Sequence, residues 1–167
     1  MAASVTQIAT SADLLAIARA VAERSAERYG EMAEAFEMAC NLDTAGAFRA
    51  LAADQNAQAA ALPAGTPVPP GSLDWFERLP EIADPDSVHY LMLPWHAHDL
   101  ALRAAERAQA FFAQLAATAA GDVRDMAQDL AKRGQAQVEH LRAGRDACPE
   151  PHPGWWEDQD GPNWDAD

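Results

Sequence analysis

Four long stretches of this chain repeat apolar residues at every third or fourth position, and this spacing constrains the fold more than any other feature. Such a period places the apolar side chains on one face of an α-helix. In the first stretch the apolar face is formed by Leu14, Ala18, Val21, Ala22, Ser25, Tyr29, Met32, Ala33 and Phe36. Alanine, which accounts for 40 of the 167 residues, loses no side-chain entropy in a helix. The sequence therefore predicts an all-α fold.

Polar or proline-rich breaks separate the predicted helices and indicate how they connect. We expect long helices at about residues 12–39, 44–62, 94–119 and 122–142, with Gly144 and Pro149 ending the last of them. The breaks after the first and third helices are short, whereas a proline-rich crossover, residues 63–93, joins the second to the third. Two helical hairpins joined by one long crossover are the layout of a four-helix bundle. We predict a bundle domain over residues 1–145 and an acidic tail over residues 146–167.

The charge balance excludes several classes of partner. The chain has 26 acidic residues against 12 basic ones, for a net charge of −14. Such a surface does not attract nucleic acid and disfavours anionic membranes. No apolar run approaches the roughly 20 residues of a membrane span, and no basic segment precedes the first apolar residues as in a secretory signal. The two cysteines, Cys40 and Cys148, indicate a reducing compartment, so we expect a cytoplasmic protein.

The two predicted hairpins also resemble each other. AERSAERYGEMA in the first helix aligns with AERAQAFFAQLA in the third, and LAADQNAQAAAL aligns with LAKRGQAQVEHL. Four stretches, ARAVAERSAERYGEMA, FRALAADQNAQAAAL, LALRAAERAQAFFAQLA and DVRDMAQDLAKRGQAQVEHL, together resemble the ferritin-like superfamily, specifically the bacterial rubrerythrin-type ferritin family. The resemblance covers residues 12–145. It implies a ferritin-like four-helix bundle, often a homodimer, whose core holds a di-iron or di-manganese site.

The resemblance also indicates which positions would hold the metals. In that family, each hairpin supplies one Glu from its first helix and a Glu-x-x-His from its second. Carried onto this sequence residue by residue, the six ligand positions are Ala22, Gln55, Gln58, Ala105, Gly134 and Gln137. All six ligands are replaced, so the resemblance implies a degenerate site without a metal cofactor. We expect the three glutamines to hydrogen-bond one another, a backbone carbonyl or trapped water, because burying an amide without partners costs roughly 1–3 kcal/mol. The alternative is a small-molecule pocket at the same place.

An alternative is a di-metal site built from residues next to the expected positions. Its candidate ligands are Glu23, Asp54, Glu106 and His140. One residue along a helix corresponds to about 100° around it, so these side chains should point away from the core. We instead expect Glu23 to pair with Arg19 and Glu106 with Arg103 on one helix face.

Three hypotheses for the function follow from these patterns. The first is a non-catalytic ferritin-like binding or accessory protein, and analogy with the fold of redox metalloenzymes suggests that it assists or regulates one of them. The second is a di-metal carboxylate oxidase or peroxidase of the rubrerythrin type that uses the shifted ligands. The third is an all-α chaperone for redox-enzyme maturation, suggested by HYLMLPW at residues 89–95 and by the aromatic pair at residues 111–112.

The tail is the segment most suited to a protein partner. It contains Trp155, Trp156 and Trp164 among acidic residues and has no Lys or Arg. Tryptophans often anchor protein interfaces. The alternative is a tail that folds back onto its own bundle or onto a second copy of the chain.

Overall fold

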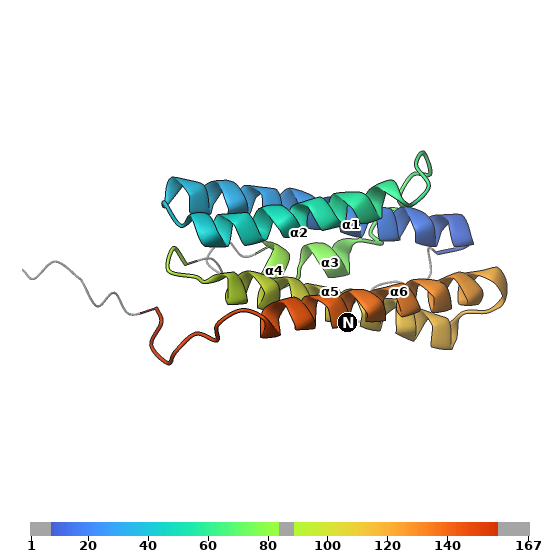
Figure 1. The fold of residues 1–167 in the computed structure, drawn as a ribbon. Coiled ribbons are helices and arrows are strands. Elements are labelled where there is room, and N and C mark those ends of the chain that lie inside the picture. The colour runs from blue at the N-terminus through green and yellow to red at the C-terminus, as the bar shows by residue number, and fades with distance from the viewer. Residues whose placement is uncertain (1–7, 84–88, 157–167) are drawn as a thin grey trace, which may run out of the picture.

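The computed structural model describes residues 8–83 and 89–156 (Figure 1). Its long helices are α1 (Ser11–Met38), α2 (Leu42–Ala60), α5 (Pro94–Thr118) and α6 (Gly121–Asp146), and its short ones are α3 (Asp74–Glu77) and α4 (Pro80–Ala83). In Figure 1 the α1–α2 hairpin forms one layer and the α5–α6 hairpin the other. Each hairpin packs tightly within itself, and α2 also contacts α5 while α1 contacts α6. The predicted all-α architecture of two hairpins joined by a long crossover is confirmed.

Side-chain caps define where the first hairpin begins and turns. The Thr10 hydroxyl accepts a hydrogen bond from the Asp13 N–H at 3.2 Å, and the Asp13 carboxylate accepts one from the Thr10 N–H at 2.8 Å. The hydrogen bond from the Thr10 N–H is the main cause that lowers the pKa of Asp13. At the hairpin turn, the Asn41 side chain accepts from the Thr44 N–H and donates to the Met92 carbonyl at 2.8 Å. Asn41 therefore caps α2 and also ties the turn to the end of the crossover.

The fourth long helix is about one turn longer than predicted. Gly144 does not end α6, which continues to Asp146. A Cβ atom at Gly144 would lie 2.9 Å from His98 Nδ1, so the missing side chain lets α6 approach α5. Arg145 then pairs with Asp99 of α5 at 3.2 Å, which holds the last turn in place. The prediction was wrong because a glycine in a helix contact and a glycine at a helix end look alike in the sequence.

The crossover, in which the sequence predicts one short helix at about residues 73–78, contains two and packs onto the bundle through aromatic side chains. Trp75 stacks on Phe111 with ring centroids 4.4 Å apart, and Phe76 is buried. The additional helix, α4, brings Glu81 into the interior, where it pairs with Arg107 of α5 at 3.2 Å. The crossover therefore covers the bundle along α5 and contributes to its core.

The hydrophobic core is divided into two clusters at opposite ends of the bundle. The first cluster lies at the α1–α2 turn and consists of Tyr29, Met32, Ala33, Phe36, Ala45, Phe48, Leu51, Ala97, Leu100, Ala101, Leu102, Val138 and Leu141. The second cluster lies at the α5–α6 turn and consists of Leu14, Ile17, Ala18, Val21, Phe76, Leu79, Phe112, Leu115, Val123, Ala127 and Leu130. The layer between these two clusters contains mainly alanine, glycine and glutamine.

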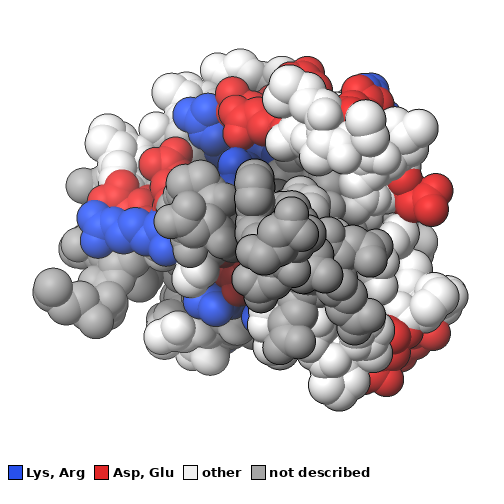
Figure 2. All heavy atoms as spheres, turned by 90° about the vertical axis from the view of Figure 1, so that its left-hand side faces the viewer, with Lys and Arg blue, Asp and Glu red and all other residues white. Residues whose placement is uncertain are grey.

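Most of the arginines lie beside carboxylates. On the end of the molecule shown in Figure 2, the blue side chains are adjacent to red ones. One such pair joins Arg49 of α2 to Glu37 of α1 at 2.6 Å and lowers the pKa of Glu37 through a hydrogen bond. Within the described ranges, no helix combines the length and the apolar character that crossing a membrane requires.

Candidate binding cavity at the centre of the bundle

A cavity of about 440 Å³ occupies the layer between the two hydrophobic clusters. All four long helices line it. The six positions at which the resemblance implies replaced metal ligands all belong to its wall: Ala22, Gln55, Gln58, Ala105, Gly134 and Gln137. The structure therefore brings together residues from four separate helices that sequence reasoning had assigned to one centre.

Small residues on α1 and α5 leave this volume open. Ala22 is buried on α1, and Ala105 lies on α5 between Ala101 and Ala108, which also line the cavity. Alanines at these spacings form one face of a helix without side chains long enough to reach across the bundle. Most of the wall is therefore apolar, and its short alanine side chains leave the centre of the bundle unfilled.

Gly134 has a packing role that sequence reasoning missed. A Cβ atom at this position would lie 3.1 Å from the Cβ of Gln109 and 3.3 Å from its Cα, so α6 lies directly against the α5 backbone here. A glutamate in place of Gly134 would need the two helices to move apart.

The expected network among the three glutamines does not form. The structure shows no hydrogen bond between the side chains of Gln55, Gln58 and Gln137 among its described residues. Instead, the Gln137 Nε2 atom is buried without a hydrogen-bond partner. The glutamines therefore do not bond one another, and their hydrogen bonding to trapped water stays a prediction.

The cavity wall includes one charged side chain, Arg133, at its exposed edge on α6. Neither a carboxylate nor an imidazole is among the described residues that line it. Tyr29 lines it as well, and burial together with the nearby charge of Glu81 raises the pKa of this phenol. Sequence reasoning missed Arg133, although its position four residues before Gln137 places both on one side of α6.

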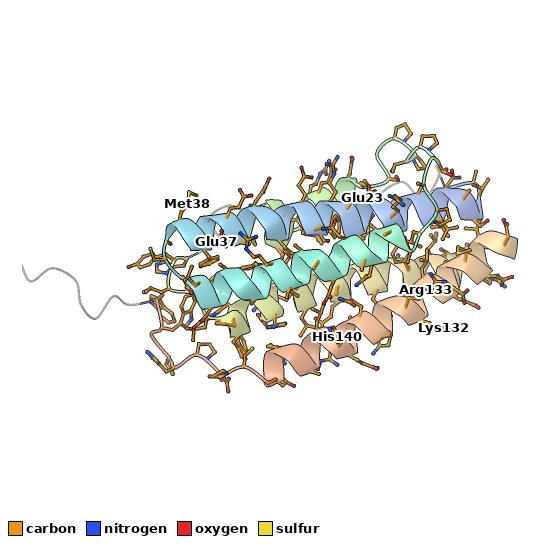
Figure 3. All side chains as sticks on the ribbon, turned by 45° about the horizontal axis from the view of Figure 1, so that its top comes forward. Glu23, Glu37, Met38, Lys132, Arg133 and His140 are labelled. Atoms are coloured by element: carbon orange, nitrogen blue, oxygen red, sulfur yellow. The ribbon has the colours of Figure 1, made fainter. Side chains whose placement is uncertain are left out.

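The shifted ligands of the alternative hypothesis are not brought together. Glu23 pairs with Arg19 at 2.8 Å, as expected, whereas Asp54 and His140 approach each other to 3.7 Å on the surface. Figure 3 shows Glu23 on α1 and His140 on α6, far apart on the two layers. In the described part of the chain, no group of three or more His, Cys, Asp or Glu side chains could hold a metal ion. A rotation of about 100° per residue explains why these positions lie on the outside.

The partner of Glu106 also differs from the prediction. Glu106 pairs with Arg142 of α6 at 3.0 Å rather than with Arg103. Arg103 pairs with Asp99 at 2.6 Å, one turn earlier on α5. Glu106 is thus part of the contact between α5 and α6.

The described part of the tail folds back onto the bundle. The Trp155 ring lies 4.0 Å from that of His96, measured between centroids, and His96 Nδ1 accepts a hydrogen bond from the Leu93 N–H at 3.0 Å. Burial lowers the pKa of His96. Trp156 is 56% exposed, and Trp164 lies outside the described residues. Of the three predicted docking residues, Trp155 therefore contacts its own chain and Trp156 faces outward.

Comparison with known proteins supports the fold. The chain matches no protein-family model and no curated protein. It is similar to a crystal structure titled COG1633, an uncharacterized conserved protein from Magnetospirillum magnetotacticum MS-1. The two are 30% identical, the match covers 86% of this chain and 99% of that one, and the TM-score is 0.56. The chain therefore belongs to the same family as this uncharacterized conserved protein and folds as a ferritin-like four-helix bundle.

Proposed function

We propose that this chain is a non-catalytic, ferritin-like binding protein in which a cavity replaces the di-metal centre of the rubrerythrin type. The observation that carries the proposal is the convergence of all six replaced ligand positions on one cavity. The scaffold still directs these positions to the centre of the bundle, but it presents alanine, glycine and glutamine there.

The chemistry of the wall opposes a di-iron or di-manganese site. Hard divalent metals favour carboxylate oxygens, and imidazole supplies the nitrogen ligands of such sites. The described wall has neither, and its one charged group, Arg133, is a cation. Neutral amides do not compensate the charge of two divalent ions in a partly enclosed site. The cavity therefore suits a neutral or anionic occupant better than a pair of metal ions.

Metal analysis of the purified full-length chain tests this proposal. The chain should be loaded anaerobically with Fe(II) or Mn(II), freed of loosely bound ions by gel filtration and measured by plasma mass spectrometry. We expect far less than one ion per chain. Two tightly held ions per chain would overturn the proposal, and their loss in Glu106→Ala would then support the alternative of a di-metal oxidase with shifted ligands.

An accessory role implies a protein partner, and we include one in the proposal. The supporting feature is Trp156, a large aromatic side chain that is 56% exposed next to an acidic tail. The fold suggests a redox metalloenzyme as the kind of partner, and a homodimer as the default assembly. Affinity capture with the full-length chain and with Trp156→Ala tests the role of the tail, because an unchanged set of captured proteins would remove Trp156 from the proposal.

A further inference from the structure

We propose that the central cavity binds an apolar carboxylic acid, with its carboxylate held by Arg133 and Gln137 and its apolar part between the two hydrophobic clusters. This inference rests on the proposed function, since it assigns to the cavity an organic ligand where the rubrerythrin type holds metals. It is carried by two polar groups that have no partner and line the same space.

Arg133 is the first of these groups. The chain has eleven arginines, and nine of them lie within 4.0 Å of a carboxylate. Of the other two, Arg124 donates to the Ala119 carbonyl at 2.9 Å. Arg133 alone has neither an ion pair nor a hydrogen bond to the described residues, although the chain carries a net charge of −14. An arginine that stays unpaired among so many acids, on the wall of a cavity, is available to an anion.

Gln137 is the second group, and it lies one helical turn from the first. Residues four apart share one side of a helix, so the Arg133 guanidinium and the Gln137 amide both border the cavity from α6. The Gln137 Nε2 atom is buried and has no hydrogen-bond acceptor. A buried donor without an acceptor lowers stability, and a bound ligand that carries an acceptor oxygen would relieve this cost. A carboxylate can accept from both groups at once, one oxygen facing each donor.

The remainder of the wall specifies an apolar body for the ligand. Beyond these two donors, the wall is mostly apolar, with eight alanines together with Val21, Phe76, Phe112 and Leu130, and its other polar side chains are Ser25, Tyr29, Gln55, Gln58 and Gln109. The volume of about 440 Å³ lies within the range of ligand pockets, roughly 300–1,000 Å³. About fifteen water molecules occupy this volume in liquid water, at ~30 Å³ each, so a ligand of about ten to fifteen heavy atoms would fit.

Figure 3 shows Arg133 on α6 next to Lys132, and this neighbour provides a matched control. Both residues are exposed and carry one positive charge, but only Arg133 lines the cavity. Substituting either with glutamine changes the net charge of the chain equally. A difference in ligand binding between the two variants therefore reports the site and not the overall charge.

Calorimetric titration of the metal-free full-length chain with octanoate, decanoate and 2-naphthoate tests the inference, with decanol as the uncharged probe. We expect at least one of the acids to bind with one molecule per chain, and decanol to bind at least tenfold more weakly than decanoate. Arg133→Gln should weaken binding of the acid at least tenfold and remove its advantage over the alcohol. Lys132→Gln should bind as the unmodified chain does, and thermal unfolding should show that both variants are folded.

Two results would overturn the inference. One is no saturable binding of any of the three acids, and the other is equal binding by Arg133→Gln and Lys132→Gln. Failure of this inference is distinguishable from failure of the proposed function. A chain without metal that binds no acid would contradict only the ligand, whereas a chain with two ions would contradict the proposed function itself.

Discussion

At the scale of single residues, backbone conformation and burial decide how several side chains affect the stability of the fold. Cys40 has a φ of 59°, the one positive φ of a residue other than glycine among those described. It follows α1, where the Cys40 N–H bonds to the Glu37 carbonyl and the Asn41 N–H bonds to the Phe36 carbonyl. This pattern is the Schellman motif, which favours glycine at the left-handed position. Both cysteines are free thiols.

Cys40→Gly should therefore stabilise the chain. A side chain in the left-handed region costs about 1–2 kcal/mol, and part of this is regained with glycine, for an expected gain of about 0.5–1 kcal/mol. Urea unfolding measures it, and Cys40→Ser is the control because serine keeps the Cβ atom. An equal gain from both substitutions would show that the backbone conformation is not the cause.

His96 and His98 should make the chain less stable in mild acid. Burial lowers the pKa of both, and for His98 the charge of His140 adds to this effect. Each folded-state pKa lies below the unfolded value of about 6.5. The stabilisation they provide is therefore present above about pH 6.5 and is lost as the pH falls through the lowered values, because the unfolded chain binds protons more readily.

His96→Gln tests this dependence. Glutamine at the third position of α5 can still accept from the Leu93 N–H, as in a capping box, but does not titrate. The free energy of unfolding should fall less steeply between pH 7 and pH 5.5 in the variant than in the unmodified chain. Above pH 7.5 the two profiles should run parallel, and equal slopes in the acidic range would contradict the prediction.

At the scale of helices, glycines show where elements touch. Gly134 and Gly144 both lie on α6 where it meets α5, whereas Gly46 of α2 has no atom within 4 Å of where its Cβ would be. Helix propensity alone cannot distinguish these sites, because glycine is about 1 kcal/mol less favourable than alanine in any helix interior. The difference comes from the neighbouring helix.

Replacing these glycines with alanine should separate the two effects. Gly46→Ala should raise the free energy of unfolding by about 0.5–1 kcal/mol. Gly134→Ala should be less stable than Gly46→Ala by about 1 kcal/mol or more, because its Cβ would lie 3.1 Å from the Gln109 Cβ and would overpack the contact. Equal gains in thermal or urea unfolding would contradict the close approach of α5 and α6.

A second contact between elements joins the two helices of the first hairpin. The Arg19 guanidinium donates to the carbonyls of Ala59 at 3.1 Å and Leu62 at 2.8 Å, and pairs with Glu23 at 2.8 Å. The Ala59 carbonyl belongs to the last turn of α2, where it also accepts from the Leu62 N–H at 3.1 Å, and the Leu62 carbonyl lies just past the helix end. Arg19, on α1, thus caps the C-terminal end of α2. The spacing in sequence predicted its pairing with Glu23 but not this role.

At the scale of the whole molecule, the core is interrupted at its centre. Two hydrophobic clusters stabilise the ends of the bundle, and the layer between them contains a cavity and the unpaired Gln137 Nε2 atom. Proteins commonly retain such unfavourable features where a binding site needs them. The cavity should therefore lower stability in the absence of a ligand.

Gln137→Leu should then stabilise the ligand-free chain. Leucine removes a buried donor that lacks an acceptor, a penalty of about 1–3 kcal/mol, and contacts the apolar wall. We expect the free energy of unfolding in urea to rise by about 1 kcal/mol. Gln135→Leu is the control, since Gln135 is exposed on the same helix and donates to Glu139 at 3.0 Å. A loss of stability in Gln137→Leu, or an equal change in the control, would contradict this account of the core.

Much of this architecture could be predicted from the sequence. The four long helices lie within a few residues of their predicted limits, and residues 22, 55, 58, 105, 134 and 137 indeed meet at one centre. The partner of Glu106 could not be predicted, because Arg142 lies on another helix, 36 residues away. Neither could α4 or the true end of α6, since both depend on contacts with α5.

The sequence by itself determined that the chain forms two helical hairpins, because period, caps and breaks act over a few neighbouring residues. It also put alanine, glycine and glutamine at the six positions where the resemblance implies metal ligands. Only the tertiary structure decided that their replacements enclose a cavity, and that Arg133 and Gln137 border it without partners. The reason is physical: a cavity and an unpaired donor depend on distances between helices, which the packing of residues far apart in the chain sets.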